Sequence, residues 1–252
     1  MPGRKRIGLA RALSKKGYCS RSQAAVLIRA GRVALNGRVA RDPETPVRIR
    51  VDHIKVDGAP IEKAPLVYLM LNKPRGVVTT ASDERERETV YDLLPRDTPW
   101  VGPVGRLDKA SEGLLLLTND SDWSAKITDP DVHVEKKYHV QVNRVADEAL
   151  IAKITRSGCA ENADFAGAVG DLRAKSARLL RHGEKNSWLE ITLDEGKNRQ
   201  IRRLLEAAGV EVLRLVRISI GPLQLGDLKK GTARELTADE KRQIDRHLTG
   251  AP

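Results

Sequence analysis

Aromatic residues and cysteines are scarce in this chain. Only 3% of its 252 residues are Phe, Trp or Tyr, and it has two cysteines, Cys19 and Cys159. Cysteines this far apart match no zinc or redox spacing, so we expect both to be free thiols in a reducing compartment. So few aromatics also argue against a protein that binds single strands mainly by stacking bases on its side chains.

Long hydrophobic runs are missing as well. No apolar stretch approaches the roughly 18 residues of a membrane span, and no apolar signal-peptide core follows the basic N-terminus. We therefore expect a cytoplasmic protein without membrane contact. The five histidines are scattered, and the sequence has no phosphate-binding glycine loop, dinucleotide fingerprint or zinc-ligand pair. We expect neither a metal nor a cofactor.

Acidic residues are absent from the beginning of the chain, where the positive charge is concentrated. The net charge is +11, and residues 1–60 hold 14 Lys and Arg against 4 Asp and Glu, with no acidic residue before Asp42. A basic block of this kind indicates a polyanionic partner. The alternative is a disordered basic tail, which the regular pattern of the segment argues against.

That pattern predicts two helices followed by short strands. Leu9 and Leu13 recur at helical spacing, and Ser20 with Gln23 makes a capping box that starts a second helix. Asn-Gly at residues 36–37 predicts a β-hairpin between 33–35 and 38–39, and two more short strands are expected at 47–51 and 54–56. The segment is therefore expected to be an ordered module.

This module resembles the alpha-L RNA-binding motif, which was named from a small-subunit ribosomal protein. The resemblance rests on residues 17–24 and 28–37 and covers about residues 7–57. It implies RNA binding, and we expect phosphate contacts from four arginines, Arg21, Arg29, Arg32 and Arg38. A segment with two prolines, residues 59–65, is typical of a linker. We therefore predict an RNA-binding module at 1–61 and a second domain at 62–252.

The second domain mixes strands and helices without regular alternation. Strands are expected at 66–71, 113–118, 137–143, 187–193 and 213–219, and helices at 121–128, 146–156, 199–207 and 238–248. Such an order favours an α+β fold with a mostly antiparallel mixed sheet. The charged tail after about residue 227 is expected to form either an amphipathic cover or a solvated end.

The most distinctive stretch runs from Gly105 to Asp120. It places one carboxylate, Asp108, between Arg106 and Lys109, just before a glycine and four leucines. A run this short and apolar predicts a buried strand, and loops held by rigid strands often carry catalytic groups. The residues alone leave two interpretations open: a catalytic aspartate, or a surface aspartate paired to a basic neighbour.

Four segments together resemble the bacterial ribosomal RNA pseudouridine synthases: residues 71–79, the Asp108 loop, residues 135–140 and residues 195–205. The resemblance covers most of residues 66–222. Gly-Arg-Leu-Asp followed by Ser-x-Gly-Leu-Leu, from Gly105 to Leu115, is the most specific motif, and Gln-Ile-Arg-Arg at 200–203 is an independent match. The resemblance implies an isomerase that cuts uracil from its ribose, rotates it and rejoins it through carbon, without metal or cofactor.

The resemblance also implies roles for single residues. Asp108 would act at the reacting nucleoside, by attack on the ribose or the base or by taking a proton. Arg202 would pair with Asp108, although Arg199 and Arg203 lie within one turn of it. Tyr138 would stack on the target base or move a proton, its alternative being a tyrosine packed in the core. RNA contacts are expected from Arg106, Lys197, Arg199 and Arg203, whereas Lys73 and Pro74 are expected to shape a loop.

The expected activity is site-specific isomerisation of uridine in ribosomal RNA, with the base flipped out of its stack. The expected partner is ribosomal RNA or a ribosomal subunit precursor, and the protein is expected to be a monomer. One alternative is a non-catalytic rRNA-binding or ribosome-assembly protein on the same fold. Another is a hydrolase that releases uracil from DNA. The sequence names neither the target uridine nor the ribosomal subunit.

Overall fold

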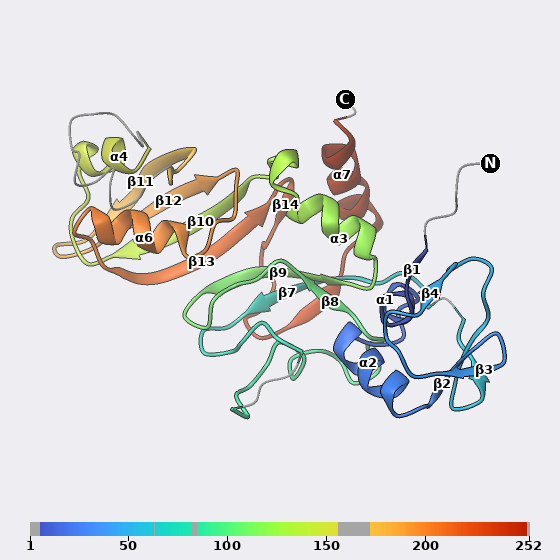
Figure 1. Ribbon diagram of the computed structural model, residues 1–252. Helices are drawn as coiled ribbons and strands as arrows, with labels where there is room; N and C mark the ends of the chain where they lie inside the picture. The colour runs from blue at the N-terminus through green and yellow to red at the C-terminus, as the bar shows by residue number, and fades with distance from the viewer. Residues whose placement is uncertain (1–5, 63, 82–84, 156–171, 251–252) are drawn as a thin grey trace.

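The computed structural model describes residues 6–62, 64–81, 85–155 and 172–250 (Figure 1). Cys159 lies outside the described residues, whereas Cys19 is a buried free thiol. No helix in these ranges is long and apolar enough to cross a membrane. The N-terminal elements are β1 (Ile7–Gly8), α1 (Leu9–Lys15), α2 (Arg21–Arg29), β2 (Val33–Leu35), β3 (Arg38–Ala40), β4 (Pro46–Val47), β5 (Ile54–Val56) and β6 (Ala59–Pro60).

The N-terminal module is ordered, as its pattern predicts. Ser20 caps α2, with both halves of the capping box formed, and Asn36 and Gly37 take the positive φ angles of a hairpin turn. The predicted strand at 47–51 is wrong beyond Val47. There the Asp52 carboxylate accepts the Arg48 amide at 2.7 Å and closes a turn. Helices α1 and α2 pack on the strands β2, β4 and β5 around a small apolar core of their own.

The rest of the described chain is built around a nine-stranded sheet. Its strands are β7 (Tyr68–Lys73), β8 (Gly102–Val104), β9 (Glu112–Thr118), β10 (Lys136–Val142), β11 (Ser176–His182), β12 (Ser187–Leu193), β13 (Val212–Ile220), β14 (Leu223–Gln224) and β15 (Ala233–Glu235). Their order is β11-β12-β10-β13-β9-β7-β15, with β14 on β13 and β8 on β9. Within the described residues, the pairs of neighbouring strands in this sheet are antiparallel, except β9 and β13, which are parallel. The fold is therefore α+β with a mostly antiparallel mixed sheet.

The run of leucines forms β9, the strand at the middle of this sheet. All seven of its residues are buried. Leu115 and Leu117 join the core on one face of the sheet, and Leu114 and Leu116 join the core on the other. Because side chains alternate across a strand, both faces must be covered. Each buried leucine contributes about 1.5–3 kcal/mol of transfer free energy, which makes β9 a rigid support for the loop before it.

Helices cover the two halves of the sheet separately (Figure 1). α3 (Ser121–Thr128) and α7 (Ala238–Thr249) contact β8 and β14, whereas α4 (Glu148–Thr155) and α6 (Gln200–Ala207) contact β11 and β13. A short 3-10 helix, η1 (Pro130–Val132), follows α3. In α7, Ile244 is fully buried and Asp245 accepts a hydrogen bond from Trp123. The tail is thus an amphipathic cover.

The N-terminal module contacts the sheet domain through the segment that follows β6. The side chain of Asn119 donates to the Pro65 carbonyl at 2.7 Å and accepts from the Val67 amide at 2.9 Å. The Lys15 ammonium lies 2.6 Å from the Asp122 carboxylate at the start of α3. These contacts attach the module beside α3, while a domain boundary near residue 62 stays a prediction.

Candidate active site

The candidate site lies where β9 and β13 run parallel, at the junction of the two halves of the sheet. Gly113 is paired with Arg217 there. Gly113 has φ +100°, and a Cβ atom on it would lie 2.2 Å from the Arg217 carbonyl oxygen. Only glycine permits this approach, which explains the glycine of the Ser-x-Gly motif. Residues just before β9 are therefore held against β13.

The Asp108 loop connects β8 to β9, and its backbone is held at every residue from 107 to 111. Lys73 Nζ donates hydrogen bonds to the carbonyls of Asp108 (3.2 Å) and Ser111 (2.9 Å). The Leu107 carbonyl accepts from Thr79 Oγ1 (2.8 Å), and the Lys109 carbonyl accepts from the Gly76 amide (2.8 Å). The Ala110 carbonyl accepts from Arg202 Nη2 (3.1 Å). A reacting group on such a loop is pre-organised. Lys73 shapes the loop, as expected, and it is completely buried.

The arginine closest to the Asp108 carboxylate is Arg199, not Arg202. Arg199 Nη1 lies 3.9 Å from Asp108 Oδ2, and the two side chains are 51% and 40% exposed. Arg202 makes no ion pair within the described ranges. Its guanidinium donates instead to the carbonyls of Ala110 and Val212, because the helix α6 turns it toward the backbone of the Asp108 loop. The predicted Asp108–Arg202 pair is thus replaced by a pair with Arg199.

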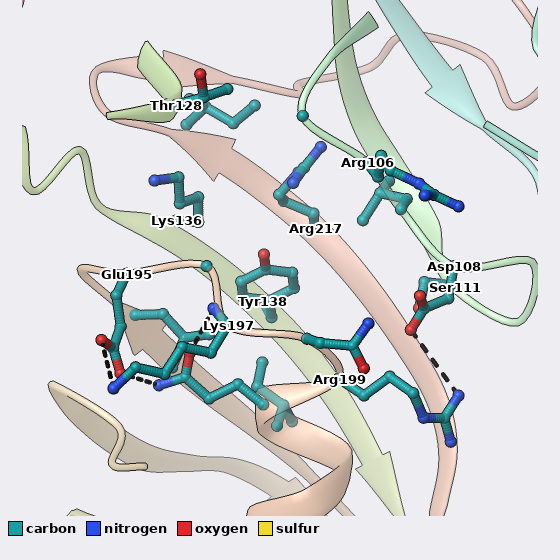
Figure 2. A pocket seen from close by; sticks show the side chains of 18 of the residues that line it. Arg106, Asp108, Ser111, Thr128, Lys136, Tyr138, Glu195, Lys197, Arg199 and Arg217 are labelled. Carbon is teal, nitrogen blue, oxygen red and sulfur yellow. Dashed lines mark hydrogen bonds and ion pairs between the residues drawn. The ribbon is translucent and has the colours of Figure 1, made fainter. Parts of the chain in front are cut away.

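A cavity of about 630 Å³ opens beside Asp108. Tyr138 on β10 and Arg217 on β13 line it with Asp108, and Figure 2 shows the Tyr138 hydroxyl pointing toward Lys136 and Arg217. Tyr138 is only 9% exposed and also belongs to the core of the domain. The ring of this tyrosine is therefore packed in the core while its polar end faces the cavity, and a role of Tyr138 toward the target base stays a prediction.

The turn before α6 forms another wall of the cavity. The buried Gln200 side chain donates to the Glu195 carboxylate at 2.9 Å and accepts from the Lys197 amide at 3.2 Å. Arg199 caps α6 in a left-handed conformation, φ 50°. These contacts present Lys197 and Arg199 to the cavity as exposed cations, although Lys197 is also paired with Glu195 at 3.0 Å.

The other predicted RNA-binding residues lie at two places. Arg106 is exposed and lines the cavity, whereas Arg203 is exposed on α6 outside it. The four arginines of the N-terminal module that were expected to contact phosphates are exposed: Arg21, Arg29, Arg32 and Arg38. Arg32 is held by the Asp57 carboxylate at 2.8 and 2.6 Å, so its charge is partly neutralised.

Two cations of the cavity were missed by the sequence interpretation, Lys136 and Arg217. Burial, with a smaller contribution from the nearby Arg217 charge, lowers the pKa of Lys136 to about 8. Arg217 is 5% exposed. Arg217 stands between Val216 and Ile218 in β13, and a charge within such an apolar run is the signal that could have identified it. Lys136 lies next to Lys137 in a largely polar strand, which gave no such signal. The described residues contain no group of three acidic, His or Cys side chains that could hold a metal ion.

Comparison with known proteins agrees with this geometry. The family model for RNA pseudouridylate synthase matches residues 67–207, and that for the S4 domain matches residues 7–52. The chain is 36% identical over 241 residues to ribosomal large subunit pseudouridine synthase B of Bacillus subtilis, covering 94% of each chain. It is 36% identical to an uncharacterized RNA pseudouridine synthase of Aquifex aeolicus, covering 92% of this chain and 91% of that protein.

A solved structure of a pseudouridylate synthase superimposes with a TM-score of 0.63 at 28% identity, covering 94% of this chain and 99% of that one. The region that the family model matches includes β9, the Asp108 loop and Tyr138, and it ends before β13. The Asp108 carboxylate is held beside Arg199 and borders a cavity wide enough for a nucleotide. An S4 domain precedes this site in the chain. This protein therefore belongs to the RNA pseudouridylate synthase family.

Proposed function

We propose that this enzyme isomerises specific uridines of large-subunit ribosomal RNA, with Asp108 as the catalytic carboxylate. The observation that carries the proposal is the Asp108 side chain itself. It is 40% exposed, borders the cavity and stands on a loop whose backbone is held residue by residue. The ribosomal target is supported by the name of the Bacillus subtilis relative, which matches this chain along nearly its full length.

The chemistry needs a fixed anion near the sugar. Breaking the bond between uracil and ribose makes the sugar electron-poor and the base electron-rich, so an ionised carboxylate at the sugar stabilises the first change or attacks it. Arg199, at 3.9 Å, places an opposite charge beside the Asp108 carboxylate and orients it. Arg202 fixes the Ala110 carbonyl in the same loop, which makes it a positioning residue in this proposal.

RNA recruitment is assigned to the N-terminal module, residues 1–61, and catalysis to residues 62–252. Arg21, Arg29 and Arg38 are exposed on the module, and Arg106 and Lys197 are exposed at the cavity. Together they could hold phosphates on both sides of a flipped uridine, which offsets part of the unstacking cost of a few kcal/mol. We expect a cytoplasmic monomer.

The first prediction concerns Asp108. Asp108→Asn and Asp108→Ala should lower the rate of pseudouridine formation by about 10⁴-fold or more, while RNA binding is retained because the carboxylate repels phosphate. The substrate is ribosomal RNA from cells that lack this protein, and modified positions are mapped at nucleotide resolution. Asp97→Asn, an exposed carboxylate remote from the cavity, is the matched control and should keep full activity.

Each other outcome has a defined meaning. Full activity of both Asp108 variants would remove this residue from the mechanism. RNA binding by wild-type protein without any isomerisation would favour a binding or ribosome-assembly protein. Release of free uracil would indicate a hydrolase, and modified positions confined to the small subunit would correct the assignment of the target.

A further inference from the structure

The floor of the active-site cavity holds a buried guanidinium group with an unsatisfied donor. Arg217 Nε donates to the Leu114 carbonyl at 2.7 Å, which fixes the side chain. Its Nη2 atom is buried and has no hydrogen-bond partner, and no carboxylate lies within ion-pair distance of it in the described ranges. Buried donors are nearly always satisfied in folded proteins. An orphan guanidinium donor in a cavity wall therefore indicates that a ligand supplies the acceptor.

Lys136 adds a second positive charge to the same floor. It is half-buried on β10, the neighbour of β13, and makes no ion pair within the part of the chain that the structure describes. Burial lowers the pKa of Lys136 to about 8, with Arg217 contributing to the shift. The Asp194 charge offsets these two positive charges only in part, and two close cations that form no ion pair are unfavourable unless an electron-rich group enters between them.

The depth of these cations indicates which part of a nucleotide they meet. A flipped uridine remains tied to its strand by the phosphates, so its base enters the cavity first. Arg106, Lys197 and Arg199 are exposed and suit the phosphates, whereas Arg217 is 5% exposed and lies beside the Tyr138 hydroxyl (Figure 2). The groups on a uracil that can accept hydrogen bonds from Arg217 and Lys136 are its two carbonyl oxygens.

We propose that Arg217, assisted by Lys136, hydrogen-bonds a carbonyl oxygen of the flipped uracil and stabilises the negative charge that the ring acquires during isomerisation. When the bond from N1 to C1′ breaks, its electron pair leaves with the ring and spreads onto the carbonyl oxygens. After C5 has bonded to C1′, the C5 proton is lost and N1 gains a proton, so no co-reactant is required. This inference rests on the proposed function and adds the residues that hold the leaving base.

The test compares Arg217→Met with an arginine variant elsewhere in the same sheet. Arg178→Met on β11 is the control, because Arg178 is paired with Glu190 and does not line the cavity. Two RNAs are used, the mapped ribosomal RNA fragment with its target uridine and the same fragment with an abasic ribose at that position. Single-turnover rates are measured on the first RNA, dissociation constants on both, and thermal unfolding on every variant.

Stabilisation of the base should appear in the rate and not in RNA affinity. We expect Arg217→Met to lower the single-turnover rate by about 100-fold or more, as loss of one donor to a developing anion does. The dissociation constants of both RNAs should stay near the wild-type values, and Arg178→Met should keep the wild-type rate. An Arg217→Met rate equal to wild type would overturn the inference. Weakened binding of the abasic RNA would also overturn it, because the ligand would then be a phosphate.

Lys136→Met keeps the test decisive if Arg217→Met does not fold. Lys136 makes no hydrogen bond within the described residues that would support the fold, and its removal should lower the rate by about 10-fold. An unchanged rate in that variant would contradict the inference. Failure of wild-type protein to modify any RNA would instead refute the proposed function, so the two failures are distinguishable.

Discussion

At the scale of single residues, Lys73 shows how a buried charge can serve a site without touching the substrate. Its ammonium group donates to three carbonyls, those of Pro74, Asp108 and Ser111. Burial lowers the pKa of Lys73 to about 8, against the opposing effect of the Asp108 carboxylate. A neutral amine has two hydrogens in place of three, so deprotonation leaves one of these carbonyls without a donor.

We therefore predict that pseudouridine formation falls as pH rises through about 8. The effect of rising pH on the stability of the fold has the opposite sign. Because the pKa of Lys73 is lower in the folded protein, the unfolded chain binds more protons above about pH 8, and this residue's contribution makes the free energy of unfolding rise with pH.

The rate of pseudouridine formation is measured between about pH 7 and about pH 9.5. Wild type and Lys136→Met are compared, because Lys136 titrates in the same range. The difference in unfolding free energy between wild type and Lys73→Met gives the stability effect. A rate that does not change over this interval in Lys136→Met would show that the charge of Lys73 is not needed.

At the scale of secondary structure, the parallel contact of β9 with β13 decides where the site is. Glu112, the first residue of β9, is 3% exposed and is held by Arg214 at 2.9 Å and Lys230 at 2.5 Å. Burial alone would raise the pKa of Glu112, but the hydrogen bonds from these two cations outweigh it and lower the pKa. The next residue, Gly113, lets β13 approach, so the start of β9 is fixed by charge and by shape.

Gly113→Ala should displace this junction. The alanine Cβ would lie 2.2 Å from the Arg217 carbonyl oxygen, and the positive φ alone costs about 1–3 kcal/mol for a residue other than glycine. We expect a lower midpoint of urea unfolding and a strong loss of activity, because Arg217 and the Asp108 loop move apart. Gly183→Ala is the control, because Gly183 lies in a hairpin with ordinary φ and its Cβ would meet only Asn186 Oδ1, at 3.7 Å. Equal stability of the two variants would contradict the close approach.

At the scale of the whole molecule, the charge of the N-terminal module is the main electrostatic asymmetry. The module is attached beside α3 by the Lys15–Asp122 pair and the Asn119 hydrogen bonds. Residues outside it are nearly balanced in charge. Long-range attraction of RNA should therefore originate in the module, whereas the cavity supplies chemistry.

A triple variant, with Arg21, Arg29 and Arg38 each changed to Gln, tests this division. Three lost phosphate contacts should lower the slope of log affinity against log salt concentration by about 2. The rate at saturating RNA should not change. A triple variant of equal charge, with Arg96, Lys185 and Arg246 changed to Gln, is the control. Equal salt slopes in the two triple variants would show that the module is not the RNA contact.

The sequence alone determined the elements whose signals are local. The capping box at Ser20, the Asn36-Gly37 turn and the four leucines of β9 act within a few residues, so their structures follow from nearby chemistry. The motif around Asp108 also identified the family. Strands such as β11 escaped prediction because most of its residues are exposed and it has no strong apolar alternation.

Only the tertiary structure decided which cations meet in the cavity. Arg217 and Lys73 lie far apart in the chain, and β9 brings both beside the Asp108 loop. Whether Arg199 or Arg202 pairs with Asp108 depends on how the start of α6 is placed against the sheet. Residue spacing along a helix does not determine that placement. Hydrogen bonds and ion pairs act over a few ångströms, so the partners of a charge are set by the packing of strands distant in sequence.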